Sequence, residues 1–134
     1  MTKLIDIEGV GPAYAAKLQK AGVRSADSLL ARGGTPAGRK EIAAKSGVSD
    51  AQILEWVNHV DLFRVKGVGS EYADLLEAAG VDTVVELAQR NPEQLLPKLL
   101  TVNQAKRLVR RPPGMAQVKS WIQQAKKLPR KVSY

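Results

Sequence analysis

The stretch Arg64–Val81, RVKGVGSEYADLLEAAGV, decides the fold of this 134-residue chain. Two glycines, Gly67 and Gly69, flank the single aliphatic residue Val68, and a helical pattern of apolar positions follows them. Gly80 ends that pattern, because glycine tolerates the left-handed conformation found at helix C-termini. A tight glycine turn that leads into a helix N-terminus exposes backbone N–H groups, which are the donors of an anion-binding site.

The same pattern occurs earlier in the chain. Gly9, Val10 and Gly11 precede another helical stretch, which Gly22 ends. Gly9 lies 58 positions before Gly67, and the other matching residues keep the same separation. The chain is therefore predicted to contain two internal repeats. Strand signals are essentially missing from the sequence, which predicts an all-α fold.

The repeated pattern is aliphatic-x-Gly-aliphatic-Gly-x-x-x-Ala-x-x-Leu-x-x-x-Gly, at Ile7–Gly22 and at Val65–Gly80. It resembles the helix-hairpin-helix motif of DNA-repair and recombination proteins, and the whole chain resembles a bacterial family of tandem helix-hairpin-helix proteins with no assigned biochemical function. The resemblance implies a SAM-like helical domain with repeats at 1–60 and 61–128 and a C-terminal tail at 129–134. It also implies that hairpin amides, in some proteins with a monovalent cation, bind the phosphates of one DNA strand.

Charge is distributed unevenly along the chain. The net charge is +8, and residues 94–134 hold ten Lys or Arg and no Asp or Glu. A basic surface of this kind favours a polyanionic partner. Cysteine is missing, which excludes disulfides and thiolate zinc sites and favours a cytoplasmic location. No long apolar run follows the first residues, so we expect neither a signal peptide nor membrane binding.

The second hairpin and the basic C-terminal segment together form the predicted interface. Helices are expected at 92–100 and 103–109, so that Lys106 and Arg110, and likewise Arg107 and Arg111, would share a helix face. Contact with phosphates would follow the backbone without reading bases. We expect the nucleic-acid-binding residues to be Arg64, Lys66, Gly67, Val68, Gly69, Ser70, Lys106, Arg107, Arg110 and Arg111.

Three acidic residues work against this interpretation or limit it. Asp6 and Glu8 flank the first hairpin and would repel phosphate, so Gly9, Val10 and Gly11 are interpreted as structural. Glu71 stands where many DNA-binding members of the family carry Lys or Arg. Its carboxylate would stabilise its own helix N-terminus, which is the position that a phosphate would occupy.

Other functions receive less support. The segment 43–56 matches the outline of a helix-turn-helix, but its second helix contains no Lys or Arg, so we interpret it as packing. His59, the single histidine, is expected at the surface of the junction between the repeats. With no metal cluster, catalytic triad or phosphate loop, an enzyme is not expected, and no cofactor is required. The alternative to DNA binding is a protein-interaction module whose basic end docks an acidic partner.

Overall fold

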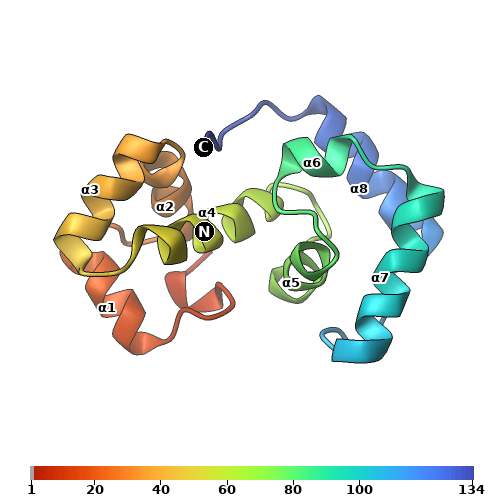
Figure 1. The fold of residues 1–134 in the computed structure, drawn as a ribbon, viewed down its shortest axis with the longest axis horizontal. Helices are drawn as coiled ribbons and strands as arrows, with labels where there is room; N and C mark the ends of the chain where they lie inside the picture. The colour runs from red at the N-terminus through yellow and green to blue at the C-terminus, as the bar shows by residue number, and fades with distance from the viewer. Residues whose placement is uncertain (1) are drawn as a thin grey trace. The chain divides into compact units, whose positions relative to one another are not determined.

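The computed structural model describes residues 2–134, and in that range the chain forms α-helices and one short 3-10 helix, with no β-strand (Figure 1). The chain divides into two compact units. The first comprises residues 2–61 together with 131–134, and the second comprises residues 62–130. Among the described residues no helix is long and apolar enough to cross a membrane.

The first unit contains a 3-10 helix and four α-helices. Helices α1 and α2 both pack against α3. Local side-chain caps begin three of these helices: Ser25, Thr35 and Ser49 each accept a hydrogen bond from the amide three residues later. The elements are η1 (Leu4–Asp6), α1 (Pro12–Lys20), α2 (Ala26–Gly33), α3 (Pro36–Ser46) and α4 (Asp50–Leu62), of which only the last residue of α4 belongs to the second unit.

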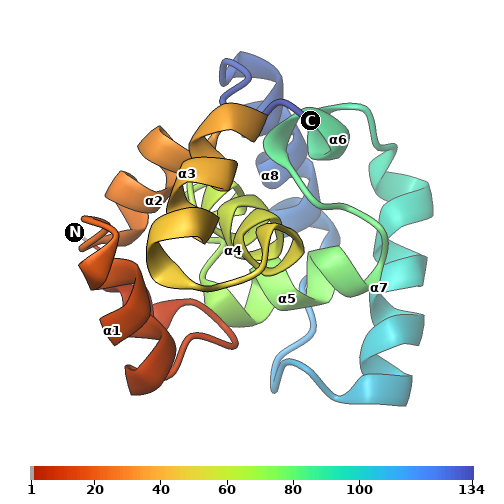
Figure 2. The same ribbon diagram turned by 60° about the vertical axis from the view of Figure 1, so that its left-hand side comes forward.

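The second unit contains four α-helices. Helices α6 and α7 pack against α8, and α5 packs against α7, as the two ribbon views show (Figures 1 and 2). Thr83 and Asn91 begin α6 and α7 by accepting hydrogen bonds from first-turn amides. The elements are α5 (Ser70–Ala78), α6 (Val84–Ala88), α7 (Pro92–Lys106) and α8 (Met115–Lys127).

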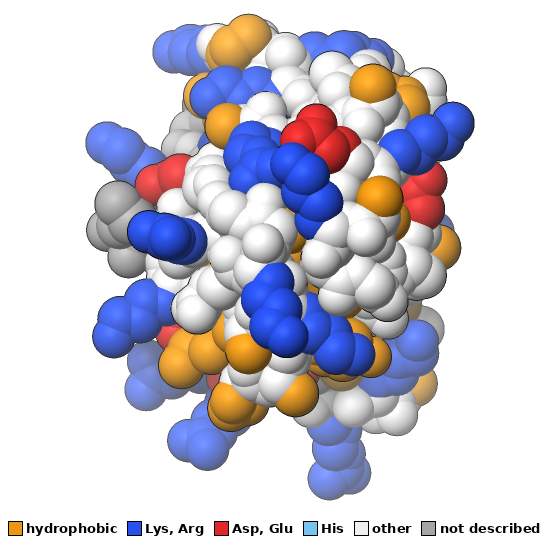
Figure 3. All heavy atoms as spheres, turned by 90° about the vertical axis from the view of Figure 1, so that its left-hand side faces the viewer, with side chains coloured by type: hydrophobic (Ala, Val, Ile, Leu, Met, Phe, Trp, Pro, Cys, Tyr) orange, Lys and Arg blue, Asp and Glu red, His pale blue; other side chains and the backbone are white. Residues whose placement is uncertain are grey.

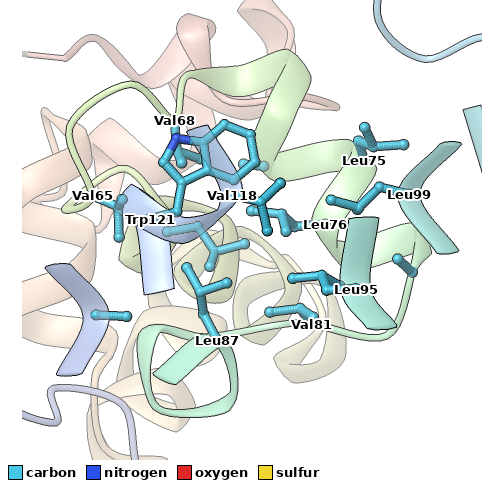
Figure 4. Close-up of a cluster of buried hydrophobic side chains, with 14 of the residues drawn as sticks. Val65, Val68, Leu75, Leu76, Val81, Leu87, Leu95, Leu99, Val118 and Trp121 are labelled. Carbon is cyan, nitrogen blue, oxygen red and sulfur yellow. The ribbon is translucent and has the colours of Figure 1, made fainter. Parts of the chain in front are cut away.

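The core of the second unit is built from aliphatic side chains around one indole. Trp121 of α8 lies beside Val65 and Val68 of the glycine bend, and leucines of α5, α6 and α7 close the cluster (Figure 4). Burying such side chains is the main favourable term in folding. Because Val68 is only 5% exposed, the middle residue of the Gly-Val-Gly turn points inward and anchors the bend to this core.

Helix α7 corrects one prediction. Two helices were expected at 92–100 and 103–109, but a single helix runs from Pro92 to Lys106. Pro97 lies inside it and does not end it, because Leu95 and Leu99, on either side, are buried in the same core. The expectation that Lys106 and Arg110, or Arg107 and Arg111, share a helix face is therefore wrong, since the helix ends before the arginines.

Two further expectations change. His59 is 2% exposed, so its prediction as a surface residue is wrong; it lies within α4, on a helix whose neighbouring residues are also buried.

The segment expected to be a tail contributes Lys131–Tyr134 to the first unit. There the buried guanidinium of Arg39 donates to the carbonyl of Ser133 at 2.7 Å and to the carbonyl of Gly33 at 2.9 Å.

Candidate nucleic-acid interface

The second glycine bend is a rigid turn. Gly67 has a φ of +94°, in the left-handed region that favours glycine. The amide of Val68 donates to the carbonyl of Val65 at 3.1 Å, which closes the turn. A Cβ atom at Gly67 would lie 3.2 Å from Nε1 of Trp121, so the backbone passes close over the indole. This position requires glycine both for its conformation and for its close approach to the ring.

Helix α8 also holds the residue before the bend. The side-chain amide of Gln124 accepts from the Lys66 backbone N–H at 2.9 Å and donates to the Lys66 carbonyl at 3.2 Å. Gln124 also donates to the hydroxyl of Ser120 at 3.2 Å, which fixes its orientation. The backbone of Lys66 is therefore fixed at two points, while its side chain remains exposed.

The bend leads into an uncapped helix N-terminus. Gly69 is the N-cap of α5, and as a glycine it has no side chain that could cap the first-turn amides. The first-turn amides of a helix have no acceptor inside the helix, and the helix dipole makes that end partly positive. A Cβ atom at Gly69 would meet nothing within 4 Å, so the space beside this residue is open. The amide of Val68, a residue expected to bind nucleic acid, is used within the turn and is not available to a ligand.

The basic segment after α7 is a loop held in a defined shape. We call Arg107–Arg111 the basic loop. Arg107 ends α7 in the left-handed conformation, with a φ of +51°, and is the single non-glycine residue with positive φ among residues 2–134. The buried side chain of Asn103 then bonds both backbone groups of Val109, accepting from its N–H at 2.9 Å and donating to its carbonyl at 3.2 Å.

A tyrosine connects the basic loop to α5. Tyr72, in the first turn of α5, donates its hydroxyl to the carbonyl of Arg111 at 2.8 Å. Its ring packs at 5.1 Å from that of Trp121, so the same side chain reaches from the core to the loop. The basic loop is thereby placed beside the N-terminus of α5, although the two segments are far apart in the sequence.

A hollow of about 540 Å³ lies between α5 and the basic loop. Three charged side chains line it: Glu71 from the first turn of α5, and Arg107 and Arg110 from the loop. Two positively charged guanidinium groups and one negatively charged carboxylate line the hollow, so its net charge is positive. The sequence did not predict this hollow or the participation of Asn103 and Gln104 in its lining.

Some of the residues predicted to bind nucleic acid lie together in the structure, and others do not. It brings Arg107, Arg110 and the N-terminus of α5 together, and all four basic residues at 106, 107, 110 and 111 are exposed. Arg64 is only half-exposed, and its guanidinium donates to the carbonyl of Pro129 at 2.7 Å. Arg64 therefore has a structural bond at the end of the unit, and it is not one of the residues that line the hollow.

The first bend has the same backbone hydrogen bond but a different helix start. Gly9 has a φ of +88°, and the amide of Val10 donates to the carbonyl of Ile7 at 3.0 Å. Pro12 is the first residue of α1, where α5 has Ser70, so this N-terminus lacks one N–H donor. The Asp6 carboxylate accepts from the backbone N–H of Lys3 at 3.1 Å.

Basic residues are also present on the first unit. Helix α1 contains Lys17 and Lys20 and no acidic residue. Figure 3 shows the side of the molecule on which Figure 1 draws α1 and α3, and Lys and Arg side chains are spread over this face without forming a single patch. On α3, a hydrogen bond from Lys45 at 2.9 Å and its positive charge lower the pKa of Glu41.

The fold and the site define a class: an all-α protein of two compact units, each with a glycine bend fixed over a tryptophan. The sequence of residues 8–128 matches the model of a family described as "Domain of unknown function (DUF4332)". Because the match covers most of the chain, the chain belongs to this family. No curated protein and no solved structure matches it.

Proposed function

We propose that the protein is a tandem helix-hairpin-helix protein that binds nucleic acid without base preference. The two glycine bends support this assignment, because both close on the same backbone hydrogen bond and both lead into a nine-residue helix. In this proposal one strand lies across the N-terminus of α5 and the basic loop. Gly69 and the first turn of α5 offer amides, and Arg107 and Arg110 offer guanidinium groups to phosphates.

One observation carries the proposal: the hydrogen bond from Tyr72 to the Arg111 carbonyl. It holds the basic loop against the helix whose N-cap, Gly69, has no side chain to cap the first turn. Backbone amides at a helix start and arginines in one place are the combination that binds phosphate. Neither element alone would distinguish a phosphate site from an ordinary surface.

A salt titration with duplex DNA of unrelated sequences tests the proposal. Each neutralised phosphate releases counterions, so an interface with about three phosphate contacts gives a slope of log K against log salt of about −3. Replacing Arg110 and Arg111 by Ala leaves the Arg111 carbonyl in place and should reduce that slope by about 1 to 2. Binding that is insensitive to salt, or no binding at low salt, would contradict the proposal.

A protein-interaction module is the second candidate function. Two contacts favour it: the Val68 amide is used inside the turn, and Gly67 lies against Trp121. Both contacts give the bend a structural role. Glu71 adds a negative charge where phosphate would bind. In that case the basic loop would bind an acidic protein. Competition distinguishes the two: an acidic polypeptide such as polyglutamate would then displace DNA as readily as unlabelled duplex does.

A further inference from the structure

The hollow between α5 and the basic loop is larger than a phosphate site requires. Its volume of about 540 Å³ lies within the range of small-molecule pockets, which is roughly 300 to 1,000 Å³, but the hollow is more open than enclosed, as suits one residue of a longer chain. A carboxylate, Glu71, lines it alongside two arginines. A site for phosphate alone would gain nothing from a carboxylate, because the two charges repel. The lining therefore suits a ligand that has both an anionic group and hydrogen-bond donors.

The chemistry of the lining is divided among three kinds of group. Arg107 and Arg110 only donate, the carboxylate of Glu71 only accepts, and the carboxamide of Gln104 does both. Leu108 adds a half-buried apolar side chain. A nucleotide has the matching parts: a phosphate for the arginines, a base edge for the carboxylate and carboxamide, and an apolar ring face.

The conformation of Arg107 is a second, independent observation. It is left-handed, and a non-glycine residue in that region is strained. The corresponding helix in the first unit, α3, ends at Gly47, which adopts a φ of +76° without strain. The second unit thus has a charged side chain at a position where glycine would be the more stable choice. Such a residue points to a function for its side chain.

We propose that the hollow accepts one unpaired nucleotide of the bound nucleic acid, with its phosphate at Arg107 and Arg110 and its base edge at Glu71 and Gln104. This inference rests on the proposed function and adds to it: paired strands are bound without base preference, and the preference concerns a single unpaired nucleotide. Guanine presents two adjacent N–H donors to a carboxylate, whereas thymine presents one N–H between two carbonyl oxygens that the carboxylate repels. The site therefore prefers an unpaired guanine and binds an unpaired thymine least well.

Fluorescence anisotropy with short labelled duplexes tests the inference. Three duplexes of the same flanking sequence are compared: one fully paired, one with a single bulged guanine and one with a single bulged thymine. A bidentate base contact should make the bulged guanine bind about tenfold more tightly than the bulged thymine. Because both bulges increase the flexibility of DNA, a preference for either over the paired duplex is not sufficient.

Two variants on α5 identify the contact. Glu71→Gln replaces the carboxylate, and Asp74→Asn makes the same change of charge at a residue outside the hollow. Glu71→Gln should reduce the difference between guanine and thymine to about twofold or less, and Asp74→Asn should leave it at about tenfold. Both variants should bind paired duplex at least as well as the unmodified protein, since each removes a negative charge.

The outcomes separate this inference from the function on which it rests. Salt-dependent binding of paired duplex, with equal affinity for the two bulges, overturns the inference and leaves the proposed function standing. A guanine preference that persists in Glu71→Gln also overturns it. Binding of none of the three duplexes overturns both.

Discussion

The two units of this protein build the same bend and surround it differently. In each, a left-handed glycine lies close to an indole, Gly9 near Trp56 and Gly67 near Trp121. The connection between the last two helices of each unit differs: residues 47–49 join α3 to α4, whereas residues 107–114 join α7 to α8. The longer connection provides the arginines of the basic loop. The bend is therefore a structural frame, and the candidate binding groups come from what is added to it.

The helices after the two bends also differ in charge. α1 has two lysines and no acidic residue, whereas α5 has three acidic residues, Glu71, Asp74 and Glu77, and no basic one. Next to this helix, the second unit has arginines on a loop bonded to Tyr72, whereas the first unit has its lysines on the helix itself. Matched substitutions at equivalent positions can therefore test the proposed nucleic-acid binding in each unit separately.

The largest expected effect comes from removing the indole under each bend. Trp56→Ala and Trp121→Ala should each lower the free energy of unfolding by about 3–5 kcal/mol, because both side chains are almost fully buried. Urea unfolding followed by circular dichroism measures this. If the free energy of unfolding falls by less than about 1 kcal/mol in one variant, the buried indole does not stabilise both bends in the same way.

The C-terminal segment of the first unit gives the next effect. Arg39→Met removes a buried guanidinium that bonds the carbonyls of Gly33 and Ser133, and it should cost about 2–3 kcal/mol of unfolding free energy. Arg64→Met, at the half-exposed bond to Pro129, should cost about 1 kcal/mol or less. Thermal unfolding compares the two variants, and a larger loss for Arg64→Met would reverse the order that burial predicts.

The two glycines of the second bend should respond unequally to alanine. Gly67→Ala should destabilise by about 1–2 kcal/mol, because it places a Cβ atom at positive φ and close to Trp121. Gly69→Ala, with negative φ and open space, should change stability by less than about 0.5 kcal/mol. Chemical denaturation measures the free energy of unfolding of both variants. Equal losses of stability would mean that Gly69 is also held by packing.

The smallest effect comes from exchanging the residues that end α3 and α7. Gly47→Arg should destabilise by about 1 kcal/mol, since only its left-handed conformation opposes a side chain there. Arg107→Gly should be neutral or stabilising by up to about 1 kcal/mol, while weakening nucleic-acid binding. Unfolding and anisotropy are measured on the same preparations. Loss of both stability and binding in Arg107→Gly would assign Arg107 a structural role.

Local signals in the sequence predicted most of the helix starts. Thr35 before Pro36 and Asn91 before Pro92 are cap-then-proline pairs typical of helix starts, and they do cap α3 and α7, because a cap depends only on residues within one turn. The left-handed conformation of Gly80, and of Gly22 at the matching position of the first repeat, was likewise predicted, since glycine alone favours that conformation without strain.

The sequence could not predict features that depend on distant contacts. The length of α7 depends on burial of Leu95 and Leu99 in a core assembled from other helices. The shape of the basic loop depends on the buried Asn103, which reads in the sequence as an ordinary polar helix residue. The hollow requires the bond between Tyr72 and Arg111, which joins segments 39 residues apart.

The central claim is that the second bend, and not the first, lies at the nucleic-acid interface. Gly69→Glu and Gly11→Glu test it as a matched pair, because both glycines are N-caps with negative φ and open space where a Cβ atom would lie. Affinity for duplex DNA at low salt is the measurement. We predict a loss of about tenfold or more for Gly69→Glu and about twofold or less for Gly11→Glu. Equal losses, or a larger loss for Gly11→Glu, would contradict the claim.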